Sequence, residues 1–239
     1  MNKDWTGRII LDRDWALFAG AGGVTPIHRH LAFKIVVGLD RPIRIVDAVG
    51  REREAQVLAV PAGEDHQVFA ESTRVAITYF DAGVFRRSVL PTDVELRALL
   101  PIYRAVDCGD RAAIRALGVQ YRALRSKILQ CRVNRAADLL RAHDTNNIDF
   151  VASQIGLSSS RLRHLFTHQV GGAPASYRKW RRLWKAAVLL GRGEKIVDAA
   201  LEAGFSDSSH LNRTFVEMLS VTPRMFQGSE VIILSWEAG

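Results

Sequence analysis

The chain has 239 residues, which is longer than most single domains, so its length predicts two of them. Hydrophobic residues make up 48% of it, as in ordinary globular proteins, and the longest apolar runs are too short to span a bilayer. Lysine and arginine number 33 against 25 aspartate and glutamate residues, and the net charge of +8 favours a polyanionic partner. The first residues lack the layout of a signal peptide, so we expect a cytoplasmic protein with no membrane partner.

Short β-strands are expected in the first part of the chain, from about residue 8 to residue 80. Residues 42–47, 57–60 and 75–79 are rich in strand-forming side chains, and glycine and proline turns separate them. Several short strands at this spacing are typical of a small barrel or sandwich. We therefore expect a β domain over residues 1–90.

Three histidines of this part lie in the segments His28-Arg29-His30 and Pro61-Ala62-Gly63-Glu64-Asp65-His66. These segments resemble the two short motifs of the cupin barrel, and the second matches Pro-x-Gly-x-x-His in full. In that family the histidines bind a metal ion together with a glutamate four residues after the second histidine. Lys34 stands at that position here, and its positive charge would repel a metal ion.

Two interpretations of the β domain follow. It either binds a small-molecule effector or is a metal-dependent enzyme, such as a dioxygenase. Lys34 and the small size of the barrel favour the effector, with neither a metal nor another cofactor. The ammonium attracts a carboxylate or phosphate, and the histidines can donate hydrogen bonds to it, so the candidate effector-binding residues are His28, His30, Lys34 and His66. The alternative, that the histidines only fill the barrel interior, stays open.

A helical connector is predicted over residues 91–130. Within it, apolar side chains recur at alternating intervals of three and four residues, at Ile114, Leu117, Tyr121, Leu124 and Ile128. Such a narrow stripe either packs on its own domain or pairs two chains as in a coiled coil. The arginine and lysine residues beside it favour the second interpretation, so we expect a homodimer through the helix over residues 110–128.

Residues 148–166 and 196–215 repeat one pattern. Each begins with Ile, continues to Ala and then to Gly four residues later, has Ser two residues after Gly, and ends with Leu and Phe on a buried side. Two short helices that cross steeply need a small residue at the crossing and a glycine in the turn, since glycine adopts positive φ without strain. Ser158 and Ser206 stand where the second helix of each unit needs an N-cap. The repeat predicts two helix-turn-helix units.

Further motifs extend this pattern over residues 133–227. They are Tyr177 six residues after Gly171, Gly204-Phe205-Ser206-Asp207, Arg213-Thr214-Phe215 and Thr222-Pro223. With them, the segment resembles the DNA-binding domain of the AraC/XylS family of transcription regulators. Ser220 departs from the usual glycine before Thr-Pro, and Phe226-Gln227 replaces the usual Tyr-Arg.

The resemblance implies that two helix-turn-helix units, joined by a long helix, place their recognition helices in successive major grooves of DNA. Carried over by position, the base-reading residues of the first unit are Ser160, Arg163 and His164, with Thr167 facing outward beside them. Those of the second unit are Ser208, Ser209, His210, Asn212 and Arg213. The basic segment between the units is expected to contact phosphates through Arg181 and Lys185.

Together these features predict a multidomain α+β protein. It has a cupin-like β-barrel over residues 1–90, a helical connector over 91–130, an all-α domain with two helix-turn-helix units over 131–229 and a C-terminal tail over 230–239. We expect a sequence-specific DNA-binding transcription regulator, not an enzyme, with double-stranded promoter DNA, a small-molecule effector, a second copy of the chain and, for an activator, RNA polymerase as partners. The alternative is a metal-dependent cupin enzyme fused to a DNA-binding module.

Overall fold

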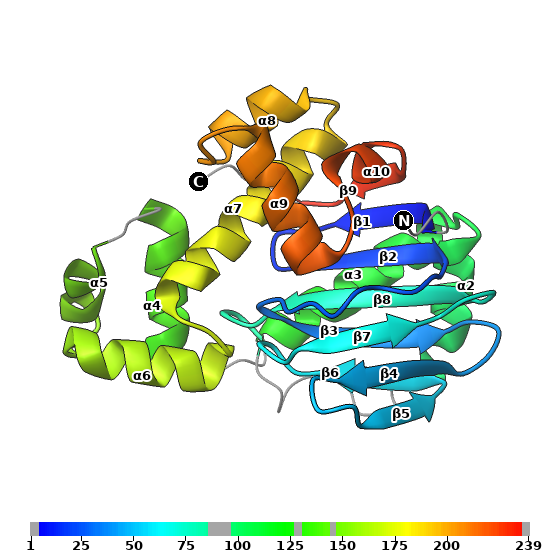
Figure 1. Ribbon diagram of the computed structural model, residues 1–239, viewed down its shortest axis with the longest axis horizontal. Helices are drawn as coiled ribbons and strands as arrows, with labels where there is room; N and C mark the ends of the chain where they lie inside the picture. Colours follow the sequence, from blue (N-terminus) through cyan, green and yellow to red (C-terminus); the bar gives the residue numbers. More distant parts are fainter. Residues whose placement is uncertain (1–4, 86–96, 127–130, 144–146, 236–239) are drawn as a thin grey trace.

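The computed structural model describes residues 5–85, 97–126, 131–143 and 147–235. The first part of the chain is a β domain, two helices cover one face of its larger sheet, and the remaining helices form a second domain beside it (Figure 1). The expected α+β fold, with a β-rich first part and an all-helical second part, is confirmed.

The strands of the described residues form two sheets. Their bounds are β1 (Thr6–Leu11), β2 (Trp15–Ala21), β3 (Ala32–Gly38), β4 (Ile43–Asp47), β5 (Glu52–Ala55), β6 (Val57–Val60), β7 (His66–Phe69), β8 (Arg74–Asp81) and β9 (Glu230–Ile233). The larger sheet has the strand order β6-β3-β8-β2-β1-β9, and the smaller sheet has the order β5-β4-β7. Val36, Ile45 and Val68 are buried between them.

The two sheets do not close into a barrel, so that detail of the expected fold is wrong. The smaller sheet has three strands and the larger has six, and β1, β2 and β9 extend beyond the smaller sheet (Figure 1). The β domain is therefore an open sandwich. Helices of the second domain cover the part of the larger sheet that the smaller sheet leaves open.

The face of the larger sheet that points away from the smaller sheet is covered by α2 (Leu100–Asp107) and α3 (Arg111–Ser126) (Figure 1). Ile114, Leu117 and Tyr121 of α3 are buried there. The ring of Tyr121 meets that of Trp15 with 5.0 Å between ring centroids.

The apolar stripe that was expected to pair two chains therefore packs on its own sheet, and that interpretation is wrong. The stripe has the same period in both arrangements, because periodicity does not identify the surface that a helix covers. Ile128 and the side chain of Leu124 lie outside the described residues. A homodimer stays an expectation, and it needs a different contact surface.

The second domain is built from seven helices within the described residues. They are α4 (Arg132–His143), α5 (Ile148–Gln154), α6 (Ser159–Val170), α7 (Pro174–Gly191), α8 (Ile196–Glu202), α9 (Ser208–Leu219) and α10 (Pro223–Gln227). Helix α7 has 18 residues, a length of roughly 27 Å, and it contacts both the first unit (α5 and α6) and the second unit (α8 and α9). The two predicted helix-turn-helix units are confirmed as structural units.

The turns of the two units follow the predicted pattern with one exception. Gly156 and Gly204 have φ of +66° and +83°, as expected for a tight turn. Ser158 caps α6 by accepting a hydrogen bond from the backbone N–H of Arg161. The predicted cap at Ser206 is wrong, because the second copy is one residue longer and Asp207 caps α9 instead.

Residues 230–233, the first part of the segment expected to be a C-terminal tail, form a strand of the first domain's sheet. Strand β9 pairs with β1 in parallel, in the register Arg8↔Glu230 to Leu11↔Ile233. An ion pair of 2.7 Å joins the side chains of Arg8 and Glu230. The chain therefore leaves the β domain, builds the helical domain and returns to the β domain.

A buried carboxylate connects the two domains. Asp81, at the end of β8, has no exposed surface. Its Oδ2 accepts hydrogen bonds from Arg181 Nη1 at 2.6 Å and from the Tyr177 hydroxyl at 3.2 Å, both on α7. A second buried pair joins Arg141 of α4 to Asp14 at 2.9 Å.

The backbones of the two domains also touch, at Gly63 and Gly171. A Cβ on Gly63 would lie 2.0 Å from the carbonyl oxygen of Gly171, so the contact requires the absence of a side chain. We expect Gly63→Ala to destabilise the protein by more than the 1–3 kcal/mol typical of backbone strain at positive φ. Thermal unfolding measures the loss.

Gly50→Ala is the matched control, because Gly50 has the same φ of +80° but open space around its Cβ. It carries the strain of positive φ without a clash between domains. Equal losses of stability in the two variants would show that the contact between Gly63 and Gly171 contributes nothing.

Candidate nucleic-acid interface and effector cavity

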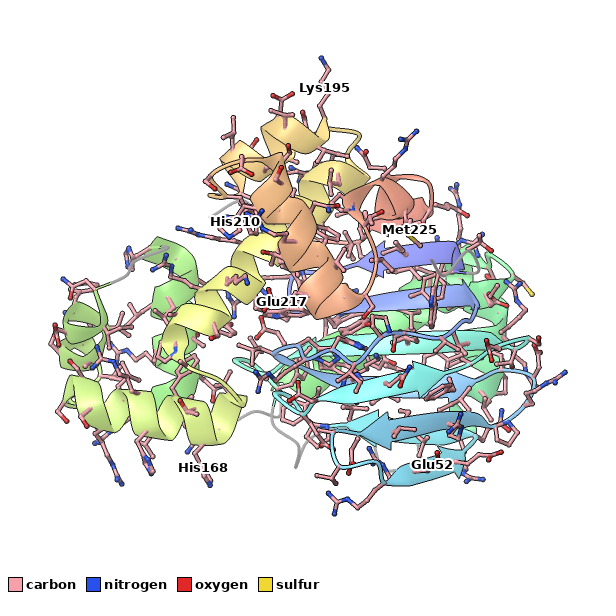
Figure 2. All side chains as sticks on the ribbon, in the orientation of Figure 1. Glu52, His168, Lys195, His210, Glu217 and Met225 are labelled. Carbon is pink, nitrogen blue, oxygen red and sulfur yellow. The ribbon has the colours of Figure 1, made fainter. Side chains whose placement is uncertain are left out.

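Helix α6 presents the predicted base-reading residues of the first unit to solvent. Ser160, Arg163, His164 and Thr167 are all exposed, while Leu162 and Phe166 on the opposite side are fully buried. Figure 2 shows His168 of the same helix projecting away from the domain. The exposed side of α6 therefore has the polar and basic groups that a major groove accepts.

The predicted base-reading residues of the second unit lie on α9 and fall into two groups by solvent exposure. Ser209, Asn212 and Arg213 are exposed, whereas Ser208 and His210 are half-buried. The His210 ring packs on Phe205 with 5.2 Å between ring centroids, and its Nδ1 lies 3.2 Å from the Ser206 hydroxyl. His210 thus supports the turn as well as facing outward.

The basic segment of α7 does not form the exposed face that its sequence suggested. Arg181 is buried against Asp81, so its expected phosphate contact is wrong. Lys185 is half-exposed, and its ammonium donates to the carbonyl of Glu202 at 2.8 Å. In a sequence, the charge of an arginine is visible but its buried carboxylate partner on another domain is not.

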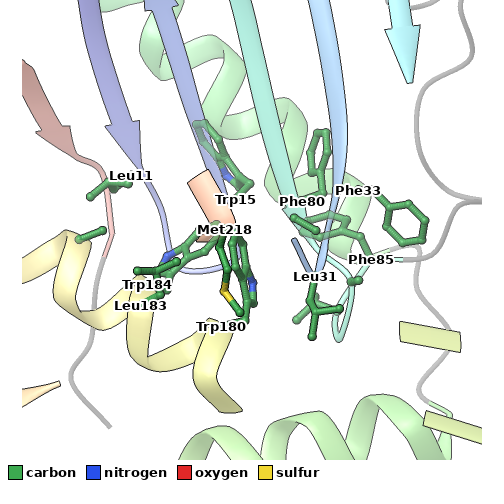
Figure 3. Packing of buried hydrophobic residues seen from close by; sticks show 14 of the residues in the cluster. Leu11, Trp15, Leu31, Phe33, Phe80, Phe85, Trp180, Leu183, Trp184 and Met218 are labelled. Atoms are coloured by element: carbon green, nitrogen blue, oxygen red, sulfur yellow. The ribbon is translucent and has the colours of Figure 1, made fainter. Parts of the chain in front are cut away.

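An apolar cavity of about 120 Å³ lies between the β domain and the second domain. Ile9, Phe18 and Ile77 of the larger sheet form part of one wall. The opposite wall comes from α7, from α10 and from the end of α9, through Trp180, Leu183, Trp184, Leu219, Met225 and Phe226. Figure 3 shows the side chains of Trp180, Leu183 and Trp184 extending from α7 toward the sheet. Sequence analysis missed these wall residues, since they are ordinary apolar positions of their helix.

Lys34 is the one charged residue among the described residues that line this cavity. It is 1% exposed, and its Nζ lies 3.3 Å from Nε2 of His28 and 3.1 Å from Nε2 of His66. The structure therefore brings Lys34 and the predicted histidines together. His30 completes the cluster, with its ring 5.0 Å from that of His66.

The hydrogen bonds of the three histidines determine which ring nitrogen carries the proton. Each Nδ1 faces a backbone carbonyl, at 3.0 Å for His28, 3.0 Å for His30 and 2.9 Å for His66. A carbonyl only accepts, so each Nδ1 must donate and each Nε2 is left as an acceptor. The expectation that these histidines donate to a ligand is therefore wrong.

The positive charge of the cluster resides on Lys34. Burial lowers the pKa of Lys34 to about 7. Burial and, after it, the charge of Lys34 lower the pKa of His28 to about 2 and of His66 to about 3. The same causes lower the pKa of His30. The imidazoles are neutral at every pH near 7.

The cluster does not fit a metal ion of the cupin type. The ring nitrogens of His28, His30 and His66 lie within 4.8 Å of one another, a spacing that a metal could use. However, the ammonium of Lys34 already donates to two of them, and no carboxylate of the described residues joins the group. Two cations at such a distance repel each other strongly in a buried site.

Comparisons with known proteins agree with the two helix-turn-helix units of the second domain. Residues 151–229 match a family described as a helix-turn-helix domain. The arabinose operon regulatory protein of Escherichia coli (strain K12) is 33% identical over 100 residues, which are 40% of this chain and 34% of that protein. The bifunctional transcriptional activator/DNA repair enzyme Ada of the same organism is 30% identical over 99 residues, 40% of this chain and 27% of Ada. The chain thus spans about a third of the length of the curated relatives it matches.

The fold is similar to that of apo ToxT from Vibrio cholerae strain SCE256, with a TM-score of 0.62 at 12% identity over 90% of this chain and 97% of ToxT. At this identity the likeness concerns the fold alone. Fold and site together define a two-domain protein with a double helix-turn-helix. Its C-terminal domain matches the helix-turn-helix family and is similar to part of the arabinose operon regulatory protein, in agreement with the resemblance that the sequence motifs predicted. Among the described residues, no helix has the length and apolar character that crossing a membrane requires.

Replacing Arg181 tests its reassigned role. Arg181→Met leaves the buried carboxylate of Asp81 without its cation, which we expect to cost on the order of 3–5 kcal/mol of stability. Urea unfolding followed by tryptophan fluorescence measures the change. Lys179→Met is the control, because Lys179 pairs with Glu217 near the surface and its loss should cost less than about 1 kcal/mol. The original phosphate interpretation would be right if Arg181→Met kept full stability but bound every DNA sequence more weakly.

Proposed function

We propose that this protein is a transcription regulator that binds promoter DNA through α6 and α9. The observation that carries the proposal is the pair of helix-turn-helix units on one long helix, with an exposed arginine on each second helix, Arg163 on α6 and Arg213 on α9. The relatives that match the C-terminal domain are mostly regulators, so we infer that the chain is not an enzyme and acts in the cytoplasm.

We further propose that a small-molecule effector occupies the cavity between the domains. The walls are apolar and Lys34 supplies the one charged group, so the cavity suits an apolar chain with an anionic head. ToxT, whose fold is similar, has also been crystallised with an unsaturated fatty acid bound, with a TM-score of 0.58 at 12% identity. A second copy of the chain and RNA polymerase remain further partners of this proposal.

The position of the cavity supports a link between effector and DNA. Trp180 and Trp184 line it from α7, the helix that joins both units, so a bound ligand touches the DNA-binding domain directly. In Figure 1, α6 runs across the view and α9 runs steeply, so their axes are not parallel. Because recognition helices must enter successive grooves of one duplex, a ligand that changes the placement of α7 changes DNA affinity.

Arginine substitutions on the recognition helices test the DNA-binding role. We expect Arg163→Ala and Arg213→Ala each to lose about 1–3 kcal/mol of binding to the specific site, if each arginine pairs with a guanine. Fluorescence anisotropy against specific and random duplexes measures the loss, and Arg192→Ala, exposed beyond the end of α7, is the control. Equal losses on both duplexes would refute base reading. Full affinity in both variants would refute the DNA-binding surface itself.

Decanoate tests the effector proposal. At a hundred times its Kd it should stabilise the protein by about 2.7 kcal/mol, seen as a rise in Tm. Lys34→Met should abolish this rise because it removes the cation, whereas Lys195→Met, at an exposed lysine, should keep it. A rise that persists in Lys34→Met, or an equal rise with 1-decanol, would contradict the role of Lys34.

A further inference from the structure

The surroundings of the Lys34 amine differ from those of a solvent-exposed lysine. It is buried, it lines an apolar cavity, and none of the ion pairs among the described residues includes it. Its two hydrogen-bond partners, His28 and His66, are neutral acceptors. The ring centroid of Tyr79 lies 5.5 Å from Nζ, but no carboxylate of the described residues pairs with the amine, so burial outweighs the groups that favour its protonated form.

An amine that loses its proton near neutral pH is a nucleophile. With its pKa near 7, about half of Lys34 is neutral at pH 7, whereas an ordinary lysine with a pKa of about 10.4 is neutral in roughly one molecule of 2,500. The groups that face it do not change charge in this range, since burial lowers the pKa values of the three histidines and raises that of Tyr79. Desolvation of a lysine in an apolar pocket is a known route to an amine that attacks carbonyl groups.

We propose that Lys34 captures apolar aldehydes in the cavity by forming an imine. This inference rests on the proposed effector cavity and adds a second ligand class to it. A carboxylate ligand pairs with the ammonium form of Lys34, whereas an aldehyde with the same alkyl chain reacts with the neutral amine. The ligand is then held covalently, and its alkyl chain lies against α7.

The reaction balances without an oxidant or reductant. The lone pair of Nζ attacks the carbonyl carbon, a C–N bond forms as the π bond of the carbonyl breaks, and one proton passes from nitrogen to the carbonyl oxygen to give a carbinolamine. The second proton of nitrogen then passes to the hydroxyl group, the C–O bond breaks, water leaves, and a C=N bond remains. Nε2 of His28 and Nε2 of His66, at 3.3 and 3.1 Å, are the nearest acceptors for the protons that leave nitrogen.

The cavity favours capture over release. An imine hydrolyses when water reaches it, and the apolar walls around Lys34 exclude water from the reacting atoms. The other described lysines lack such surroundings. Lys179 pairs with Glu217, Lys185 donates to Glu202, and Lys195 projects into solvent (Figure 2).

Reductive trapping tests the proposal on the full-length protein. Decanal and sodium cyanoborohydride at pH 7 convert an imine into a stable secondary amine that carries one decyl group. Intact-mass spectrometry counts the added groups, and peptide mapping locates them. We expect a single addition at Lys34, at least about tenfold faster than at Lys195, because the fraction of neutral amine differs by about three orders of magnitude.

Matched variants and a competitor separate this inference from the effector proposal. Lys34→Met should lose the fast addition and Lys195→Met should keep it, with circular dichroism showing that both variants are folded. Decanoate should slow the labelling of Lys34 in the native protein. Addition spread evenly over exposed lysines, or none at Lys34, overturns the imine; if decanoate still raises Tm in that case, the effector proposal stands. A further outcome is fast labelling of Lys34 in a protein whose labelling rate and Tm are both unchanged by decanoate. That result supports the imine and overturns the carboxylate ligand.

Discussion

The burial of Asp81 between the two domains is the constraint on which the rest of the structure depends. A carboxylate without exposed surface needs a cation and hydrogen-bond donors, and Arg181 and Tyr177 supply them from α7. These two donors are four residues apart, so they lie on one face of the helix. Satisfying both of them fixes the rotation of α7, and that rotation turns Trp180 and Trp184 toward the open part of the larger sheet.

Once α7 is fixed, the DNA-binding domain becomes a wall of the cavity. The small sheet leaves part of the larger sheet uncovered, and β9 returns from the helical domain to extend that same sheet. A ligand in the cavity therefore contacts a sheet and a helix that belong to different domains. Under the proposed function, one bound molecule touches both domains at once, so a coupling between effector and DNA needs no long chain of contacts.

The burial of Lys34 reduces the stability of the folded protein, because the ammonium loses its hydration. An apolar side chain would fill the same space without that loss. Two neutral histidines accept its hydrogen bonds but provide no negative charge. Buried groups with such an incomplete set of partners are often functional rather than stabilising. The three histidines come from the segments that resemble the cupin motifs, and the Lys34 amine donates to the ring nitrogens of two of them.

The sequence by itself determined the local features: the two helix-turn-helix units, the glycine turns, the cap at Ser158 and the exposed face of α6. Each of these depends on residues that are close together in the chain, within a single helix or a single helix-turn-helix unit, whose spacing the sequence displays directly. Only the tertiary structure decided that the stripe of α3 covers a sheet, that Arg181 pairs with Asp81, and that residues 230–233 form a strand. Those contacts join residues that are far apart in the chain. Periodicity and charge show that a surface or an arginine needs a partner, but the fold alone selects which partner it meets.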